Sequence, residues 1–322
     1  MLELPEPGVY AGLDWIRCTG PEALIDRLLG EMRDFAGIEG KECHGAKHFK
    51  NGASFEPGVM VSWGHKNRVC QVDVQGQRLR LIDGPARVEV LRQLLEMGMK
   101  ARRLDLAVDF VDQQRAMHRQ AVASCQAGEL CGLRSYEVKD RIQANGQALS
   151  RHLALGARES PVCARIYDKG LEQGYAVEGY WERVEVEFKK DRAEAVADAL
   201  VKDAQRSAQT LVSFVFGAFE FRTKTGRGEM ARRPLSPWWA DLLEGVAAAR
   251  TSPAGDPASF RSWLAWLQTA ALPRMLQCAE AARITPGELM EWFCQGLVPR
   301  TDDSPIVQEF VAWFATGSGE VR

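Results

Sequence analysis

Two stretches in which apolar and polar side chains largely alternate constrain the fold of this chain more than any other feature. Residues 103–110 read RLDLAVDF, and residues 181–188 read WERVEVEF. Alternation with a period of two is typical of a β-strand with one apolar face and one polar face. The two aspartates of the first stretch share one face, as do the last two glutamates of the second. The pattern predicts amphipathic strands whose acids lie on the polar side of a sheet.

The segments around these strands suggest a repeated order of elements. Strand-like segments are 9–18, 59–65, 68–74, 77–82, 101–110, 133–139, 148–155, 162–168, 180–190 and 216–223, helix-like segments are 19–35, 84–98, 113–127 and 192–205, and 36–57 is expected to be a loop. A strand, a helix, several strands and a second helix follow one another in 1–100 and again in 101–235. This order favours an α+β fold with antiparallel sheets in a duplicated strand–helix–strand unit.

The sequence changes character after this α+β part. Residues 222–234, RTKTGRGEMARRP, carry five basic residues and one acid, as expected of a basic loop or linker. Residues 251–260 read as a second linker, and Thr285–Glu288 has the form of a helix-capping box. We therefore expect an α+β region over 1–250 and a C-terminal helical region over 251–322.

Composition limits the class of protein. The formal net charge is −2, which argues against a wholly basic nucleic-acid binder but leaves room for a local basic surface. The eight cysteines include no CxxC pair and favour free thiols in a reducing compartment. No secretion signal is visible, and no run approaches the roughly 20 apolar residues of a membrane span. We expect a cytoplasmic protein that does not contact membranes.

Four carboxylates stand out as candidate metal ligands. Asp105 and Asp109 are separated by the small Ala107, and Glu185 and Glu187 are spaced in the same way. If the two strands pair, these acids converge, and a divalent cation with oxygen ligands would relieve their repulsion. Arg183 offers the alternative, a ladder of salt bridges across the strands.

Tyr167 is the candidate nucleophile. It shares a strand face with Arg165 and Lys169, and these cations are expected to lower the pKa of the phenol and to bind a phosphate. Tyr175 and Tyr180 are the alternative nucleophiles. Tyrosine is also a good strand former, so a purely structural role stays open.

Several motifs, in order, resemble the replication initiation factor family, the transposition-like Rep proteins that start rolling-circle replication of plasmids and filamentous phages. The motifs are GLDWIRCT, VDVQGQRLRLI, RLDLAVDF, ARIYDKG, YWERVEVEFKKD, FEFR and PLSPWW, within roughly residues 9–240. The order of R-x-D-x-A-x-D, R-I-Y-D-K-G and W-x-R-x-E-x-E is the most specific part. The chain lacks the histidine–hydrophobe–histidine metal triplet of the wider rolling-circle nickases.

The resemblance implies a metal-dependent DNA endonuclease and strand transferase that forms a 5′-phosphotyrosine link at the replication origin. It places the nucleophile at Tyr167, with Arg165, Lys169 and Arg183 as its cationic neighbours. The implied ligands of Mg²⁺ or Mn²⁺ are Asp105, Asp109, Glu185 and Glu187. The basic residues expected to follow the DNA backbone are Arg222, Lys224, Arg227, Arg232 and Arg233. The implied partner is single-stranded or cruciform origin DNA, and the family also allows a homodimer and a host helicase as partners.

Two other functions stay open at this point. The first is a non-catalytic DNA-binding regulator of a phage or plasmid on the same scaffold, which would bind the origin without nicking it. The second is a two-metal nuclease without a covalent step, which would still cut DNA after replacement of Tyr167 by phenylalanine.

Overall fold

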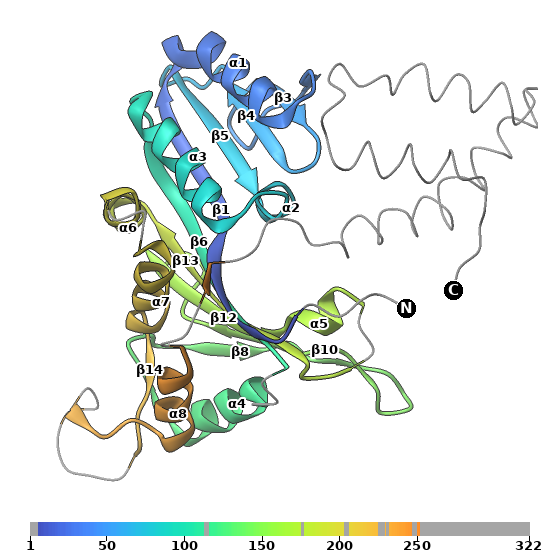
Figure 1. Cartoon of the computed structure of the whole chain (residues 1–322), viewed down its shortest axis with the longest axis vertical. Helices are drawn as coiled ribbons and strands as arrows, with labels where there is room; N and C mark the ends of the chain where they lie inside the picture. Colours follow the sequence, from blue (N-terminus) through green and yellow to red (C-terminus); the bar gives the residue numbers. More distant parts are fainter. Residues whose placement is uncertain are drawn as a thin grey trace, which may run out of the picture. The chain divides into compact units, whose positions relative to one another are not determined.

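One long sheet is the framework of the described part of the chain, which comprises residues 6–112, 116–174, 177–202, 206–224, 229, 232–246 and 250–251 of a computed structural model (Figure 1). The chain divides into two compact units, Met1–Ala258 and Ser259–Arg322, and every described residue lies in the first. Apart from Thr251, the expected C-terminal helical region, including the capping box at Thr285–Glu288, lies outside the described residues.

The neighbouring strands of the sheet are antiparallel except for one short parallel pair. Its strands are β1 (Gly8–Pro21), β2 (Lys41–Cys43), β3 (Asn51–Phe55), β4 (Val59–Trp63), β5 (Val69–Gln75), β6 (Lys100–Val111), β8 (Tyr136–Val138), β11 (His152–Leu155), β12 (Val162–Asp168), β13 (Trp181–Lys189) and β15 (Arg250–Thr251). Only β15 runs parallel to its neighbour, β1. Two small two-stranded sheets accompany it, formed by β9 (Arg141–Ile142) with β10 (Ala148–Ser150) and by β7 (Leu130–Cys131) with β14 (Glu220–Phe221).

The strand order is mirrored about the central pair β1 and β6. Outward from β1 lie β5, β4, β3 and β2, and outward from β6 lie β13, β12, β11 and β8. Each half of the fold therefore starts with a central strand, continues through a helix and returns to the sheet through four further strands. This arrangement makes β6 and β13 neighbours, so the two alternating stretches of the sequence pair directly, with Glu187 opposite Asp105 and Glu185 opposite Ala107.

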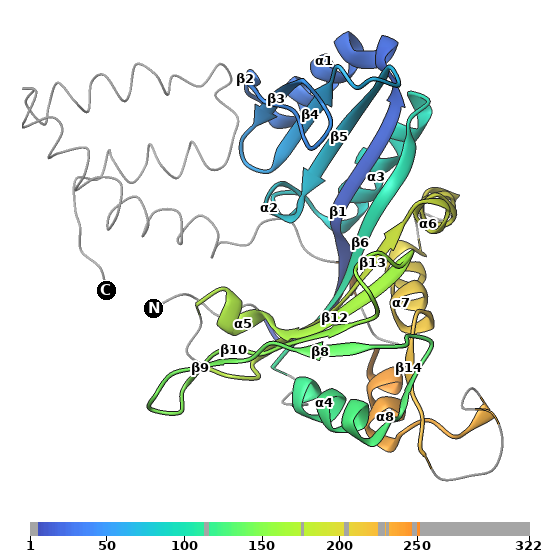
Figure 2. The same cartoon turned by 180° about the vertical axis from the view of Figure 1, so that it is seen from behind.

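The longer helices cover the apolar face of the sheet, and short ones lie on its other face. They are α1 (Ile25–Ala36), α2 (Gly76–Leu79), α3 (Gly84–Glu96), α4 (Met117–Ala127), α5 (Lys169–Glu172), α6 (Asp191–Lys202), α7 (Ser207–Gly217) and α8 (Pro237–Gly245), with a 3₁₀ turn at Glu22–Leu24. Figures 1 and 2 show α3, α6 and α7 along one side of β1 and β6, while the short α2 and α5 lie on the other side.

The core lies between the apolar face and this helical layer. Leu104, Leu106 and Val108 of β6 are completely buried, as are Val184 and Val186 of β13. Aromatic contacts join the layers, and they include Phe110 of β6 against Phe216 of α7 and Phe188 of β13 against Phe214 of α7. Burial of these side chains is the main source of stability here, because each contributes about 1.5–3 kcal/mol relative to an exposed position.

Glu182 shows how a charged residue is accommodated on this apolar side. Its carboxylate oxygens accept hydrogen bonds of 2.9 Å from the backbone N–H groups of Met117 and His118, at the start of α4. The N-terminus of a helix presents unpaired N–H donors and a partial positive charge, so it can stabilise a buried carboxylate.

The prediction of a β-strand at 77–82 is wrong. Its residues form α2 and the turn that follows, although their apolar and polar side chains alternate. A Cβ on Gly76 would lie 2.9 Å from Asp14 Oδ1, so only a glycine lets the chain leave the sheet this close to β1. The turn buries Leu79 and directs the following arginine toward the polar face of the sheet.

Two further expectations differ from the structure. The expected loop at 36–57 contains β2 and β3, and glycines allow this close packing, since a Cβ on Gly52 would be 2.9 Å from Gly45 Cα. The expected strand at 216–223 is confined to β14, because α7 runs to Gly217 and buries Leu211 and Val215 at helical spacing. Among the described residues, no helix is long and apolar enough to cross a membrane.

Candidate active site

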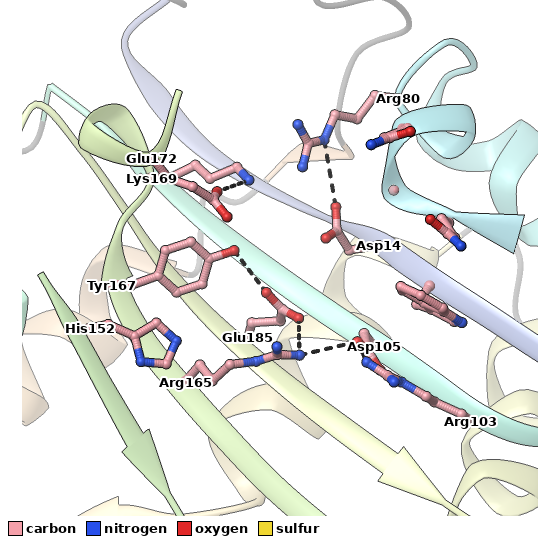
Figure 3. Close-up of a pocket in the computed structure, with 14 residues that line it drawn as sticks. Asp14, Arg80, Arg103, Asp105, His152, Arg165, Tyr167, Lys169, Glu172 and Glu185 are labelled. Atoms are coloured by element: carbon pink, nitrogen blue, oxygen red, sulfur yellow. Dashed lines mark hydrogen bonds and ion pairs between the residues drawn. The ribbon is translucent and has the colours of Figure 1, made fainter. Parts of the chain in front are cut away.

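A pocket of about 260 Å³ opens on the polar face of the sheet, where the two mirrored halves meet. The first half contributes side chains from β1, β5 and α2, and the second half contributes them from β6, β11, β12, β13 and α5. The residues that line it are Asp14, Trp15, Gln75, Gly76, Gln77, Arg80, Arg103, Asp105, His152, Arg165, Tyr167, Lys169, Glu172 and Glu185. Figure 3 shows the ten of these side chains that it labels turned toward one another.

Tyr167 lies at the centre of the second-half wall. It is carried by β12, in which Tyr167 is opposite Arg183 and Arg165 is opposite Glu185 of β13. The phenol hydroxyl donates a hydrogen bond of 2.8 Å to Glu185 Oε2, and the side chain is only 7% exposed. The phenol ring stacks on the imidazole of His152, with 5.7 Å between ring centroids. Tyr167 is therefore fixed in orientation by contacts on neighbouring strands.

The predicted lowering of the pKa of this phenol is wrong. Burial raises the pKa of Tyr167 well above its usual value, and the Glu185 carboxylate adds to the rise against the opposing charge of Arg183. The sequence showed the flanking cations but not the acid on the next strand. A hydroxyl with such a pKa needs a base within hydrogen-bonding distance to become a nucleophile, and Glu185 occupies that position.

Glu185 has the electrostatics of a base that works near neutral pH. Burial and the nearby charge of Asp14 raise the pKa of Glu185 to about 7, although Arg165 opposes the rise. One oxygen of the carboxylate accepts the hydrogen bond from Tyr167, and the other accepts one of 2.5 Å from Arg165. The carboxylate is thereby held with one oxygen directed at the phenol.

Lys169 is positioned by the start of α5. The carboxylate of Asp168 accepts hydrogen bonds from the backbone N–H of Leu171 at 2.8 Å and from that of Gly179 at 2.6 Å, which fixes the turn from β12 into the helix. Lys169 Nζ lies 5.7 Å from the centroid of the Tyr167 ring. Burial, with the charges of Arg183 and Arg80, lowers the pKa of Lys169 to about 8, and its ammonium pairs with Glu172.

Asp105, Glu185 and Glu187 are brought together as the sequence predicted, but arginines lie among them. Arg165 Nη2 is 3.2 Å from Asp105 Oδ2 and 2.5 Å from Glu185 Oε1. Arg103 binds both oxygens of Asp105, at 2.8 and 2.6 Å, and lies 3.4 Å from Glu187. The burial of Asp105 raises its pKa, which these arginines oppose.

Asp109 belongs to a separate, buried group of charges. Both of its oxygens accept hydrogen bonds from Arg183, at 2.7 and 2.8 Å, and Oδ1 also accepts one of 2.6 Å from the Trp181 indole. Arg183 in addition lies 3.0 Å from Asp14 Oδ1. The cross-strand pairing of Arg183 with an acid is the salt-bridged alternative that the sequence left open.

The four acids consequently do not fit a single carboxylate cage for a divalent cation. Asp109 is bonded to Arg183, and guanidinium groups occupy the space among the other three. Among the residues that the structure describes, no cluster of three or more His, Cys, Asp or Glu side chains is placed to hold a metal ion. Mg²⁺ or Mn²⁺ binding stays a prediction of the resemblance.

The expected DNA-binding residues lie in a different part of the fold. Arg222 directly follows β14, pairs with Glu220 at 2.6 Å and forms a β-bridge with Leu235. The preceding Phe221 packs on Trp238 of α8. The other members of the set are Lys224, Arg232 and Arg233, which are described, and Arg227, which lies outside the described residues. None of the four described members lines the pocket, and their contact with DNA stays a prediction.

The alternative nucleophiles are also elsewhere. Tyr180 packs beside Val111 and Trp181 and is not among the residues that line the Tyr167 pocket. Tyr175 lies outside the described residues. Among the tyrosines that the structure describes, the pocket contains Tyr167 alone.

The sequence reasoning missed the first-half wall of the pocket, which includes Asp14, Trp15 and Arg80. A shift in the pairing of β1 with β6 falls between Leu13 and Trp15, so Asp14 and its neighbour Trp15 both line the pocket. Strict alternation would have placed these two residues on opposite faces, and a β-bulge redirects a side chain in this way. The acid Asp14, which interrupts the strand-like segment GLDWIRCT, was the feature of the sequence that could have indicated this wall.

Comparisons with known proteins agree with this architecture. A family model described as "Replication initiation factor" matches residues 99–291, more than half of the chain. The chain is also similar to the structure of a rolling circle replication initiator protein from Geobacillus stearothermophilus, with a TM-score of 0.63 and 21% sequence identity over 77% of this chain and 100% of that chain. No curated protein sequence matches.

Proposed function

Because the chain belongs to the replication initiation factor family and has the fold of a rolling-circle replication initiator, we propose that it nicks one strand of origin DNA and transfers it to Tyr167. The observation that carries this proposal is the hydrogen bond of 2.8 Å from the Tyr167 hydroxyl to Glu185 within a pocket that also contains Arg80, Arg165 and Lys169. It provides a nucleophile, a base and cations in one place.

The proposed reaction is an in-line displacement at the scissile phosphate. Tyr167 Oη attacks phosphorus while Glu185 Oε2 accepts its proton, and the bond from phosphorus to the 3′-oxygen breaks. The leaving 3′-oxygen takes a proton, for which the Lys169 ammonium is a suitable donor because its pKa is about 8. The products are a 5′-phosphotyrosine link and a free 3′-hydroxyl that can prime synthesis.

The electrostatics of the pocket suit a nucleophile that reacts only on encounter with DNA. The raised pKa of Tyr167 keeps the phenol neutral in the free protein, and Glu185 takes up the proton only as the new bond forms. Arg165 binds the other oxygen of Glu185 and so maintains the orientation of the base. The link is also reversible, since a phenolate is an adequate leaving group for an attacking 3′-hydroxyl.

Metal dependence is the part of the proposal with the least support from the side chains. Mg²⁺ or Mn²⁺ would supply positive charge to the phosphate oxygens when bound. The arginines among Asp105, Glu185 and Glu187 already provide positive charge there, so no step above is assigned to a metal ion. Origin DNA is the proposed substrate, and a homodimer and a host helicase remain expectations from the family.

Replacement of Tyr167 by phenylalanine tests the proposal. A single-stranded oligonucleotide with the origin sequence should become covalently attached to the wild-type protein and should stay free with Tyr167→Phe. Tyr180→Phe is the matched control, because Tyr180 is outside the pocket, and it should retain attachment. Attachment to the Tyr167→Phe protein would refute the assignment of the nucleophile.

The same variant distinguishes the two other functions. The burial of Tyr167 favours a non-catalytic DNA-binding role as the second candidate, and that role predicts origin binding with no nicked product from the wild-type protein. A two-metal nuclease would nick DNA without any covalent product and would keep its activity in Tyr167→Phe.

A further inference from the structure

The first-half wall of the pocket has no assigned role. It comprises Asp14, Trp15, Gln75, Gly76, Gln77 and Arg80. All of these residues precede residue 99, where the match to the family model begins. The wall faces Tyr167 and Lys169 from across the pocket, as Figure 3 shows for Asp14 and Arg80. The pocket that contains Tyr167 is therefore lined by side chains from both halves of the fold.

The position of Arg80 is fixed by its backbone. Its N–H donates a hydrogen bond of 3.0 Å to the carbonyl of Gly76, which closes the turn of α2. Gly76 in turn packs directly on Asp14, where a Cβ would lie 2.9 Å from Oδ1 and 3.0 Å from the carbonyl oxygen. Any larger residue would push α2 away from β1. The close contact holds Arg80 at the mouth of the pocket.

The Arg80 guanidinium is the least engaged of the arginines around this site. Arg103, Arg165 and Arg183 each donate at least one hydrogen bond of 2.5–2.8 Å to a carboxylate. Arg80 Nε is instead 3.8 Å from Asp14 Oδ1, and among the described residues this buried nitrogen has no hydrogen-bond partner. Its side chain is 18% exposed. Arg80 thus has donors available for a ligand.

Asp14 has two cations beside it, and Arg80 is the more distant of the two. Arg183 lies closer to the same carboxylate oxygen, at 3.0 Å against 3.8 Å for Arg80. Burial would raise the pKa of Asp14, but the charges of Arg183 and Arg80 outweigh it and hold the pKa below its usual range. The carboxylate is therefore well stabilised, and a second cation beside it suggests a role toward an anion in the pocket.

We propose that Arg80 binds a non-bridging oxygen of the scissile phosphate, opposite Tyr167, and acts with Lys169 as a phosphate clamp built from both halves of the fold. This inference rests on the proposed nicking function. A guanidinium is suited to this position because its planar array of donors can bind two phosphate oxygens at once. The clamp stabilises the charge that develops on those oxygens as Tyr167 attacks.

A charge-neutral substrate provides a direct test. The probe is a single-stranded oligonucleotide that the wild-type protein nicks, prepared with the normal phosphodiester or with a methylphosphonate, which replaces one non-bridging oxygen, at the scissile position. On the phosphodiester, Arg80→Gln should slow single-turnover nicking by about 10²–10³-fold, the usual effect of losing one donor to a developing oxyanion. On the methylphosphonate with the contacted oxygen replaced, the same variant should differ from wild type by only a few fold.

Matched variants separate this role from a structural one. Arg92→Gln is the control for loss of an arginine, because Arg92 lies on α3, does not line the pocket, and pairs with Glu89 and Glu96. It should nick both substrates at the wild-type rate. Asp14→Asn combined with Arg80→Gln should not restore nicking, whereas restoration would show that Arg80 merely balances Asp14 and would overturn the proposal.

The outcomes for the two proposals differ. The phosphate clamp is contradicted if Arg80→Gln slows nicking equally on both substrates, or if it does not slow nicking of the phosphodiester. In either case the wild-type protein would still nick the oligonucleotide and become covalently attached to it. A wild-type protein that nicks no origin oligonucleotide would instead refute the nicking function, and the clamp with it.

Discussion

Tyr167 Oη and Glu185 Oε2 are joined by a hydrogen bond of 2.8 Å between neighbouring strands β12 and β13. In this register Glu185 is opposite Arg165, and Tyr167 is diagonally related to Glu185 across the pair of strands. The contact couples a phenol whose pKa is raised to a carboxylate whose pKa is raised to about 7. Among the four candidate acids, Glu185 is the one whose carboxylate accepts a hydrogen bond from Tyr167.

Glu185→Gln should slow nicking without unfolding the protein. Glutamine keeps the shape of the side chain but cannot accept the phenol proton, and loss of a general base lowers rates by about 10²–10⁴-fold. Single-turnover nicking under saturating protein measures this effect. Glu194→Gln, which alters an ion pair with Arg102 on the helical side, is the control and should have the wild-type rate. A Glu185→Gln rate within a few fold of wild type would contradict the assignment of the base.

The rate of nicking should have a bell-shaped dependence on pH. Glu185 must be unprotonated to accept the proton, so the rate rises as pH passes about 7, the pKa of Glu185. Lys169 must be protonated to bind the phosphate and to protonate the leaving oxygen, so the rate falls as pH passes about 8, the pKa of Lys169. A series of single-turnover rates from pH 5.5 to pH 10, for wild type and variants, checks both limbs.

Lys169→Arg is the variant that separates the two limbs of this profile. An arginine stays charged throughout the range, so the alkaline limb should move to higher pH or disappear while the acid limb remains. A profile that keeps its alkaline limb in Lys169→Arg would assign that limb to another group.

The Asp109–Arg183 pair should matter for stability. Asp109→Ala leaves a buried guanidinium without its bidentate partner, and such a change costs about 3–5 kcal/mol of the free energy of unfolding. The double variant with Arg183→Met should recover only part of this loss, because it removes the unpaired guanidinium but also removes the closer counter-ion of Asp14. Urea unfolding of the wild-type protein and of these two variants measures both effects. A loss below about 1 kcal/mol for Asp109→Ala is typical of exposed ion pairs. It would contradict the claim that the Asp109–Arg183 pair is buried away from water.

Metal dependence is tested by chelation. If Mg²⁺ or Mn²⁺ is a cofactor as the resemblance implies, protein dialysed against EDTA should bind the origin oligonucleotide, fail to nick it and regain nicking when either ion is added. Anisotropy of a labelled oligonucleotide and gel analysis of its cleavage measure the two steps separately. Undiminished nicking in EDTA would show that the arginines and Lys169 supply the positive charge without a metal ion.

The central part of the fold followed from local patterns. RLDLAVDF and WERVEVEF each have a clear period of two, which predicted two amphipathic strands. Their pairing, which the sequence left as a condition, is present in the register of β6 and β13. The repeated succession of elements was visible in the sequence, whereas the mirrored order of the strands within the sheet was not. The predicted features depend on residues close in sequence and on the burial of one face, so a single sequence contains enough information to predict them.

The chemistry of the site depended on long-range geometry. Burial raises the pKa of Tyr167, and Arg183 and Glu185 on the next strand respectively oppose and add to the rise. The neighbours of Tyr167 in sequence reveal none of these effects. The β-bulge beside Asp14 and the turn at Gly76 bring in Arg80 from the other half of the fold. The arginines that bind Asp105 and Glu185 likewise became evident only when the side chains were placed.

Identification of the residue that carries the DNA tests the central claim most directly. After reaction with the origin oligonucleotide, nuclease and trypsin treatment should leave a short nucleotide remnant on one peptide, which mass spectrometry can locate. Cleavage after Lys and Arg places Tyr167 in the tetrapeptide 166–169, apart from residues 170–183, which contain Tyr175 and Tyr180. The account predicts the remnant on 166–169. A remnant on any other tyrosine peptide, or none from a protein that nicks, would contradict it.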